Sequence, residues 1–68
     1  MISFKLEGEY IELIKLLKAC NIAESGGMAK KLVEDKKVSY NDKIEHRKRC
    51  KVRKGDVIKI GDVQIKVV

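Results

Sequence analysis

The sequence contains few of the residues from which a catalytic or metal centre is built. It has two Cys, one His and no Trp among 68 residues. Cys20 and Cys50 form no Cys-x-x-Cys pair, and with His46 as the sole histidine they offer too few ligands for a zinc site. No nucleophile and no orienting carboxylate is spaced to assemble around His46. We therefore expect a protein that is not an enzyme, with no cofactor and no small-molecule substrate.

Long apolar runs are also missing, although 44% of the residues are hydrophobic. No run approaches the roughly 18–20 residues that a membrane span requires, so we expect no membrane partner. Residues 1–7 alternate polar with apolar side chains and include Glu7, unlike a secretory signal. The length predicts a single domain over residues 1–68. The absence of a signal predicts a cytoplasmic location in which both cysteines stay free thiols.

Positive charge is abundant and is concentrated in one segment. The formal net charge of +6 divides into −1 for residues 1–28, +7 for residues 29–54 and 0 for residues 55–68. A uniformly basic surface mainly serves solubility, whereas a concentrated excess attracts polyanions. Nucleic acid is therefore the partner that the charge distribution favours.

Apolar periodicity predicts a strand and two helices in the first half of the chain. Residues 2–6 alternate with the period of two that is typical of a strand with one buried face. Residues 10–20 place apolar side chains at helical spacing, and Asn21 is a suitable left-handed stop. Ser25 can cap a second helix over residues 26–35. The apolar positions of the two helices are Tyr10, Leu13, Ile14, Leu16, Leu17 and Cys20, then Met28, Ala29, Leu32 and Val33.

The second half of the chain is predicted to consist of short strands and a basic loop. Residues 38–40 alternate as a strand, Asn41-Asp42 marks a turn, and residues 43–54 indicate a loop. Gly61-Asp62 joins two apolar segments into a two-residue hairpin. Its predicted register places Ile60 opposite Val63 and Ile58 opposite Ile65.

Ser25-Gly26-Gly27, followed by Lys30 and Lys31, forms the first candidate site. A helix N-terminus presents unpaired amides and a partial positive charge, and glycines let a phosphate approach the backbone. The Gly-x-x-x-x-Gly-Lys-Ser/Thr spacing of a nucleotide-binding loop is absent. On its own, the glycine pair is equally compatible with a flexible start to an ordinary helix.

Residues 43–54 form the second candidate site, with seven Lys or Arg in twelve positions. Three of them are arginines, which favour bidentate phosphate contacts and stacking on bases. We expect this run to contact nucleic acid rather than to form a merely solvated loop. The predicted contacts within it are Lys43, Arg47, Lys48, Arg49, Lys51 and Arg53, and Lys36 and Lys37 extend the same patch.

Three residues within this run are interpreted separately from its lysines and arginines: Glu45, His46 and Cys50. Glu45 is expected to be a local counter-ion and His46 to add to the phosphate-binding surface. Cys50 lies between Arg49 and Lys51, which can lower a thiol pKa, but a structural role is the favoured interpretation. The side chains predicted to fit core faces are Phe4, Tyr10, Cys20 and Tyr40, with an exposed stacking role as the alternative for Tyr40.

Several motifs together resemble the S4 RNA-binding domain, and the chain looks most like stand-alone bacterial S4-like proteins. The motifs are Ser25-Gly26-Gly27-Met28-Ala29-Lys30, Leu32-Val33, Lys36-x-Val38-x-Tyr40-Asn41, Arg47-Lys48 and Lys54-Gly55-Asp56-x-Ile58. They follow in this order between residues 8 and 60. Two positions depart from the family pattern, because Lys36 and Asp42 stand where the family usually has Gly.

The resemblance implies an α+β, S4-like (αL) fold, in which a two-helix pair packs on a small, mostly antiparallel sheet. It also implies an RNA surface made by the second helix and the following loop. By motif position, the contacts would be Ser25, Gly26, Gly27 and Lys30 at the helix start, Asn41 at the strand-end turn, and Arg47 and Lys48 in the loop. The expected function is non-catalytic binding of structured ribosomal or transfer RNA, with a ribosomal subunit as a candidate partner. Aromatic residues, at 4%, are too few for the stacking platforms used on single strands.

Two other classes of protein remain open at this point. The length and the initial strand followed by a helix also fit a β-grasp protein of the ubiquitin-like or sulfur-carrier type. The chain lacks the terminal Gly-Gly of that class and ends in Lys66-Val67-Val68. Composition alone also permits a basic adaptor that docks on DNA or on an acidic protein.

Overall fold

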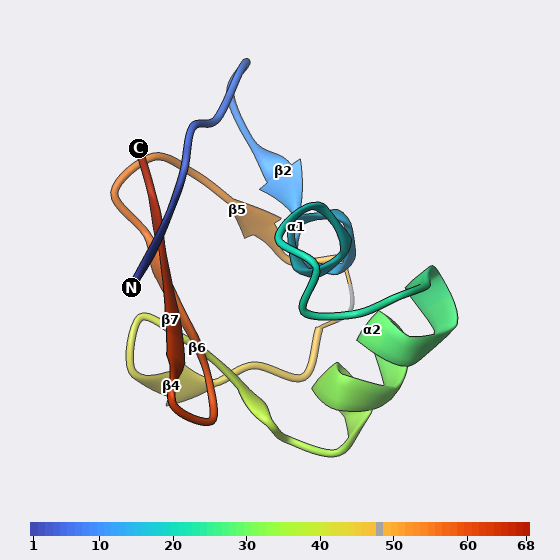
Figure 1. Ribbon diagram of the computed structural model, residues 1–68. Helices are drawn as coiled ribbons and strands as arrows, with labels where there is room; N and C mark the ends of the chain where they lie inside the picture. Colours follow the sequence, from blue (N-terminus) through green and yellow to red (C-terminus); the bar gives the residue numbers. More distant parts are fainter. Residues whose placement is uncertain (48) are drawn as a thin grey trace.

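The computed structural model describes residues 1–47 and 49–68, so the predicted contact of Lys48 lies outside the described residues. In Figure 1 the two helices lie together on one side, and the strands of the main sheet lie on the other. The elements are β1 (Ile2–Phe4), β2 (Ile11–Glu12), α1 (Leu13–Ala19), α2 (Gly26–Glu34), β3 (Val38–Tyr40), β4 (Lys43–Ile44), β5 (Lys51–Val52), β6 (Val57–Ile60) and β7 (Val63–Val67).

The main sheet has five strands in the order β1-β7-β6-β3-β4. The β6–β7 hairpin has the predicted register, with Ile60 opposite Val63 and Ile58 opposite Ile65. Gly61, at φ +59°, is the one residue of its turn with a positive φ, which is the pattern of a type II′ turn. Within the described residues β1 alone pairs in parallel, with β7, and the other neighbours are antiparallel. The mostly antiparallel sheet is therefore confirmed.

The first helix begins at Leu13 rather than at Tyr10, so the first turn of the predicted helix is wrong. The two residues before Leu13 form β2 instead, which pairs antiparallel with β5. Tyr10 is 43% exposed, so its predicted place in the core is also wrong. The apolar spacing of these residues is compatible with a helix. Ile11 and Glu12 are extended instead, because they pair with β5.

The second helix and both of its ends follow the prediction closely. Ser25 Oγ accepts a hydrogen bond from Met28 N at 3.2 Å, which confirms the predicted cap. At the other end, Lys36 N donates to Val33 O and Lys37 N donates to Leu32 O, both at 3.1 Å, which is the Schellman pattern. Lys36 has φ +60° and thus holds the left-handed conformation for which the family usually has Gly. Asn21, at φ +59°, confirms the left-handed stop predicted after the first helix.

The core contains side chains from both helices, the main sheet and β5. The largest fully buried side chains are Leu13, Leu16, Leu17, Val33, Val38, Val52, Ile58, Ile65 and Val67. Phe4, Cys20 and Tyr40 pack against them, as predicted. Met28, predicted for the same apolar stripe, is 49% exposed, so its predicted place on the buried face is wrong, and its Sδ accepts from Glu24 N at 3.5 Å. No helix among the described residues is long and apolar enough to cross a membrane.

Residues 43–54, predicted as a loop, contain the two short strands β4 and β5. β4 pairs with β3, and the residues between them, Asn41 and Asp42, have φ values of +50° and +71°. Two consecutive positive φ values are the pattern of a type I′ turn. Asp42 thus takes a left-handed conformation at the second position where the family usually has Gly. The loop prediction is wrong because each strand is too short to produce a strong periodic signal.

Candidate nucleic-acid interface

β5 and the residues beside it separate charged from apolar side chains. Cys50 and Val52 are 4% and 0% exposed, whereas Arg49, Lys51 and Arg53 are exposed. This alternation follows from strand geometry, because successive side chains of a strand point to opposite faces. The buried pair belongs to the hydrophobic core. Core packing therefore holds three cationic side chains on the outside of the short β2–β5 ribbon.

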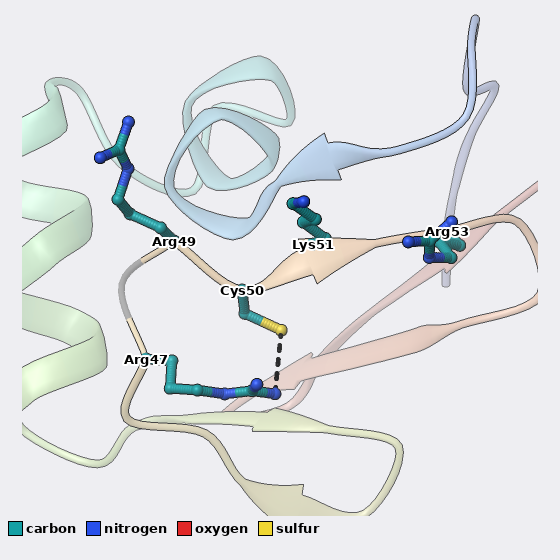
Figure 2. A pocket seen from close by; sticks show the side chains of 5 residues that line it. All are labelled: Arg47, Arg49, Cys50, Lys51 and Arg53. Atoms are coloured by element: carbon teal, nitrogen blue, oxygen red, sulfur yellow. Dashed lines mark hydrogen bonds between the residues drawn. The ribbon is translucent and has the colours of Figure 1, made fainter.

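Arg47 joins these cations at an open pocket of about 370 Å³, here called the β5 pocket. Among the described residues, it is lined by Arg47, Arg49, Cys50, Lys51 and Arg53, of which four are cationic and none is acidic. Figure 2 shows the charged side chains spread along β5 and its flanks rather than converging on one point. Such a distribution suits a chain of phosphates better than a single small anion.

Two of the four cations are oriented by residues at β2. Arg49 Nε donates to Glu12 Oε2 at 3.1 Å, and this hydrogen bond lowers the pKa of Glu12. Lys51 Nζ lies 5.0 Å from the ring centroid of Tyr10. Long side chains that are ordered before a ligand arrives lose less conformational entropy on binding. Arg49 is therefore partly preorganised, whereas the contact of Lys51 with the exposed ring is weak.

Arg47 is held by a buried carboxylate, that of Glu45, which is 7% exposed. Glu45 Oε2 accepts from Arg47 N at 2.9 Å and from Arg47 Nε at 3.0 Å, and Oε1 accepts from Nη2 at 3.1 Å. These bonds to Arg47 lower the pKa of Glu45 to about 2, against the opposing effect of burial. The predicted counter-ion role is confirmed. The side chain of Arg47 is still 68% exposed and can contact a ligand.

Asp56 fixes the backbone at the Arg53 end of the β5 pocket. Its Oδ2 accepts from Arg53 N at 2.8 Å and from the Tyr40 hydroxyl at 2.7 Å. The hydrogen bond to Asp56 raises the pKa of Tyr40 to about 12. Tyr40 is half-buried against the core, as predicted, and its hydroxyl is used inside the protein. The structure favours this role over the alternative of an exposed stacking residue.

Asn41 has a positioning role in the same network. Its Nδ2 donates to Asp56 Oδ1 at 3.1 Å, and its Oδ1 accepts from Val57 N at 2.8 Å. Both ends of the side-chain amide therefore join the β3–β4 turn to Asp56 and to the first residue of β6. The RNA contact of Asn41 implied by the family resemblance stays a prediction.

Both cysteines are free thiols, as predicted. Burial raises the pKa of the Cys50 thiol, so the alternative of a thiol activated by Arg49 and Lys51 is wrong. Cys50 Sγ accepts a weak hydrogen bond from Arg47 Nη2 at 3.8 Å, drawn as a dashed line in Figure 2. Cys50 thus has the structural role that the sequence favoured.

The start of α2, the first candidate site, lies outside the β5 pocket. Ser25 is used as the helix cap, and Lys30 is exposed. An added Cβ would meet nothing within 4 Å at Gly26 and only Ser25 Oγ, at 3.8 Å, at Gly27. Neither glycine has a positive φ. The fold therefore does not require these glycines, and the space beside the helix start is open to a ligand.

Lys36 and Lys37, which were predicted to extend the basic patch, and Lys31 of the first candidate site are exposed and do not line the β5 pocket. Lys31 pairs with Asp35 at 3.7 Å, and both line a separate pocket of about 200 Å³ together with Met28, Leu32 and Lys37. This α2 pocket shares no lining residue with the β5 pocket. The structure thus brings four predicted residues together at the β5 pocket. The other predicted residues that are exposed and lie outside that pocket are Ser25, Gly27, Lys30, Lys31, Lys36, Lys37, Asn41 and Lys43.

These features define a small α+β protein in which a helix pair covers a mostly antiparallel sheet and a cationic pocket opens beside β5. A family model described as the S4 domain matches residues 4–68. The chain belongs to the S4 domain family, which confirms the resemblance noted in its motifs.

Two curated relatives and one solved structure support this assignment. The chain is 36% identical over 55 residues to "Probable ribosome maturation protein RlbA" of Bacillus subtilis (strain 168), covering 81% of this chain and 78% of the relative. It is 34% identical over 59 residues to YbcJ of Escherichia coli (strain K12), covering 87% and 84%. The solution structure of E. coli YbcJ, described as revealing an αL (ALFAL) motif involved in RNA binding, matches with a TM-score of 0.77 at 33% identity, covering 100% and 87%. The predicted S4-like fold is therefore confirmed, and the β-grasp alternative is wrong.

Proposed function

We propose that the chain binds structured RNA without catalysing a reaction, and that the β5 pocket receives the RNA backbone. The observation that carries this proposal is the pocket itself, whose lining in the described part of the chain contains four cations and no acid. Arg47 and Arg49 are each held by a hydrogen bond to a carboxylate of the protein. Cations spread along a strand can neutralise successive phosphates, and arginines can bind them bidentately.

Ribosomal RNA is the class of RNA that we favour as the ligand, with a ribosomal subunit as its setting in the cytoplasm. The B. subtilis relative is named for ribosome maturation, and the E. coli relative carries a motif described as involved in RNA binding. Transfer RNA is the second candidate ligand, and the test described below compares its affinity with that of ribosomal RNA. Scarce aromatic residues favour recognition by shape and phosphate rather than by reading a long single strand.

The start of α2 is proposed as a second phosphate contact, made by Ser25, Gly26, Gly27 and Lys30. Its amides and open surface can receive a phosphate of the same RNA. Further contacts of the basic surface are proposed for Lys31, Lys36, Lys37, Lys43 and Lys48. They would add long-range attraction, because together with the β5 pocket they carry the excess positive charge of the chain.

The proposal is tested by replacing Arg49, Lys51 and Arg53 with Gln and measuring affinity for ribosomal RNA fragments and for transfer RNA. The control replaces Lys5, Lys18 and Lys66, which are exposed and lie outside the pocket, with Gln. Both variants lose the same formal charge. Lys15 is not used in the control because it lies 3.7 Å from Glu12, the partner of Arg49. Arg47 is not replaced because Glu45 would then be a buried carboxylate without its partner.

We expect the pocket variant to lose affinity on the order of tenfold to hundredfold and the control to lose much less. Duplex DNA and an acidic protein serve as competitors and should displace the RNA poorly. Equal losses in the two variants would indicate a nonspecific polycation and contradict a defined site. Tighter binding of duplex DNA or of the acidic protein would instead support the adaptor alternative.

A further inference from the structure

Tyr10 is an exposed aromatic side chain that lies outside the hydrophobic core. It is 43% exposed and does not belong to the core cluster against which Phe4 and Tyr40 pack. It directly precedes β2, in which Ile11 packs against the core. Because side chains alternate along a strand, Tyr10 and Glu12 share the outer face of the ribbon. This is the face that carries the cations of the β5 pocket.

The ring of Tyr10 is held beside that pocket by one of its cations. Lys51 lines the pocket, and its Nζ lies 5.0 Å from the ring centroid. A contact between an ammonium and an exposed ring is weak, whereas a bond from an ammonium to phosphate is charge-assisted. A phosphate in the pocket therefore attracts Lys51 away from the ring and leaves that ring face open. A base attached to the neighbouring sugar can then occupy this face.

On the basis of the proposed function, we propose that Tyr10 stacks on an unpaired base of the RNA whose phosphates occupy the β5 pocket. Bases inside a duplex stack on one another, so the ligand class is a structured RNA with an unpaired nucleotide in a bulge, a loop or an end. One exposed ring serves one base. Phe4 and Tyr40, the other aromatic residues, pack against the core, so the ribbon recognises a single unpaired base rather than a long single strand.

The test uses two RNA hairpins with the same stem, one fully paired and one carrying a single bulged 2-aminopurine. The fluorescence of 2-aminopurine falls when the base stacks, so the unmodified protein should quench the bulged hairpin on binding. Affinities of both hairpins are measured for the parent, Tyr10→Leu and Tyr10→Phe. Tyr10→Phe keeps the ring without the hydroxyl and is the matched control.

We expect Tyr10→Leu to lose about tenfold or more in affinity for the bulged hairpin, together with the quenching. Tyr10→Phe should retain both, and the paired hairpin should bind all three proteins within about twofold. Thermal unfolding should be unchanged in both variants because Tyr10 lies outside the core. The quenching by the parent protein tests the stacking even where a variant is poorly folded.

The remaining outcomes separate this inference from the proposed function. Equal losses of Tyr10→Leu on both hairpins would show that the ring acts by positioning Lys51, which overturns stacking. Unchanged affinity of Tyr10→Leu with no quenching by the parent would also overturn it, and the proposed function would stand if the Arg49, Lys51 and Arg53 variant still lost binding. Failure of the parent to bind either hairpin or ribosomal RNA would overturn the proposed function and this inference together.

Discussion

At the scale of single residues, the β5 pocket depends on a carboxylate that is buried inside a strongly basic segment. Glu45 is 7% exposed and makes three hydrogen bonds with Arg47. Taking a charge out of water is costly, and only a partner with good geometry offsets the cost. The guanidinium group of Arg47 is that partner, and the carboxylate in turn fixes the position of the Arg47 side chain. The acid therefore positions one cation of the β5 pocket, although it does not line the pocket itself.

The pH dependence of stability should report this pair. The folded-state pKa of Glu45 is about 2, below the ordinary value of 4.5. A carboxylate with a lowered folded pKa stabilises the fold above its unfolded pKa, and this stabilisation is lost as pH falls through the folded pKa. We expect the urea midpoint to fall between about pH 4.5 and pH 2, and Glu45→Gln to remove part of that fall. Glu7→Gln removes an exposed carboxylate and should keep the parent's pH profile; matching profiles for both variants would contradict the assignment.

Lys36 gives a second prediction at this scale, because its φ of +60° is unfavourable for a residue with a Cβ. Lys36→Gly should raise the free energy of unfolding by up to about 1 kcal/mol, since Gly adopts the left-handed region without steric strain. Lys37→Gly removes the same charge from the next position, which has no positive φ, and should not stabilise. Urea unfolding of the two variants provides the comparison. A gain in both, or in neither, would show that backbone strain is not the cause.

At the scale of elements, the sequence predicts structure from local signals more reliably than it predicts pairing between distant strands. The β6–β7 hairpin could be predicted in full register because two turn residues and the alternation beside them determine it. The β2–β5 ribbon could not, because it pairs residues that are far apart in the sequence, such as Glu12 and Lys51. Each of its strands has two residues, so neither gives a periodic signal of its own. The alternation of charged and apolar residues from Arg49 to Arg53 was the sequence feature that indicated a strand there.

In the candidate site, the cations could be predicted from the sequence more easily than the residues that hold them. Arg47, Arg49, Lys51 and Arg53 were identified from charge, and the structure gathers them at one pocket. Their partners were harder to identify. Tyr10 satisfied the spacing of a helix that in fact begins at Leu13. Asn41 carries a family motif, but its amide joins two turns of the fold. A motif can thus mark a residue without distinguishing a ligand contact from a structural one.

The start of α2 offers a prediction that separates these two roles for Ser25. Ser25→Asp keeps a good cap and places a negative charge where the helix dipole favours it, so stability should be retained. The same charge would repel a phosphate bound there, so RNA affinity should fall by about tenfold. Ser25→Ala should instead lose about 1 kcal/mol of stability through loss of the cap. Unchanged RNA affinity in Ser25→Asp would exclude the start of α2 from the interface.

At the scale of the whole molecule, short elements place apolar side chains on one side and cations on the other. The side chains of β5 that face inward belong to the core, and those that face outward line the pocket. A core substitution such as Leu17→Ala should therefore cost roughly 2–4 kcal/mol of stability, because Leu17 is fully buried. Substitutions on the outer face of the ribbon should leave stability within about 0.5 kcal/mol. Chemical unfolding of Leu17→Ala and Lys51→Gln measures both changes in stability. Similar losses of stability in the two variants would contradict this separation of the two sides.

The salt dependence of RNA binding tests how many of these outward cations act on phosphates. If the basic segment neutralises about five or six phosphates, log K should fall with log salt concentration at a slope near −4 to −5. Removing Arg49, Lys51 and Arg53 removes three of these contacts, so the slope of that variant should be shallower by about 2–3. The variant lacking Lys5, Lys18 and Lys66 loses the same net charge but no contact at the pocket, and its slope should stay near that of the parent. Since counterions are released only where a cation replaces them on the RNA, identical slopes in all three proteins would mean that the β5 pocket does not touch the backbone.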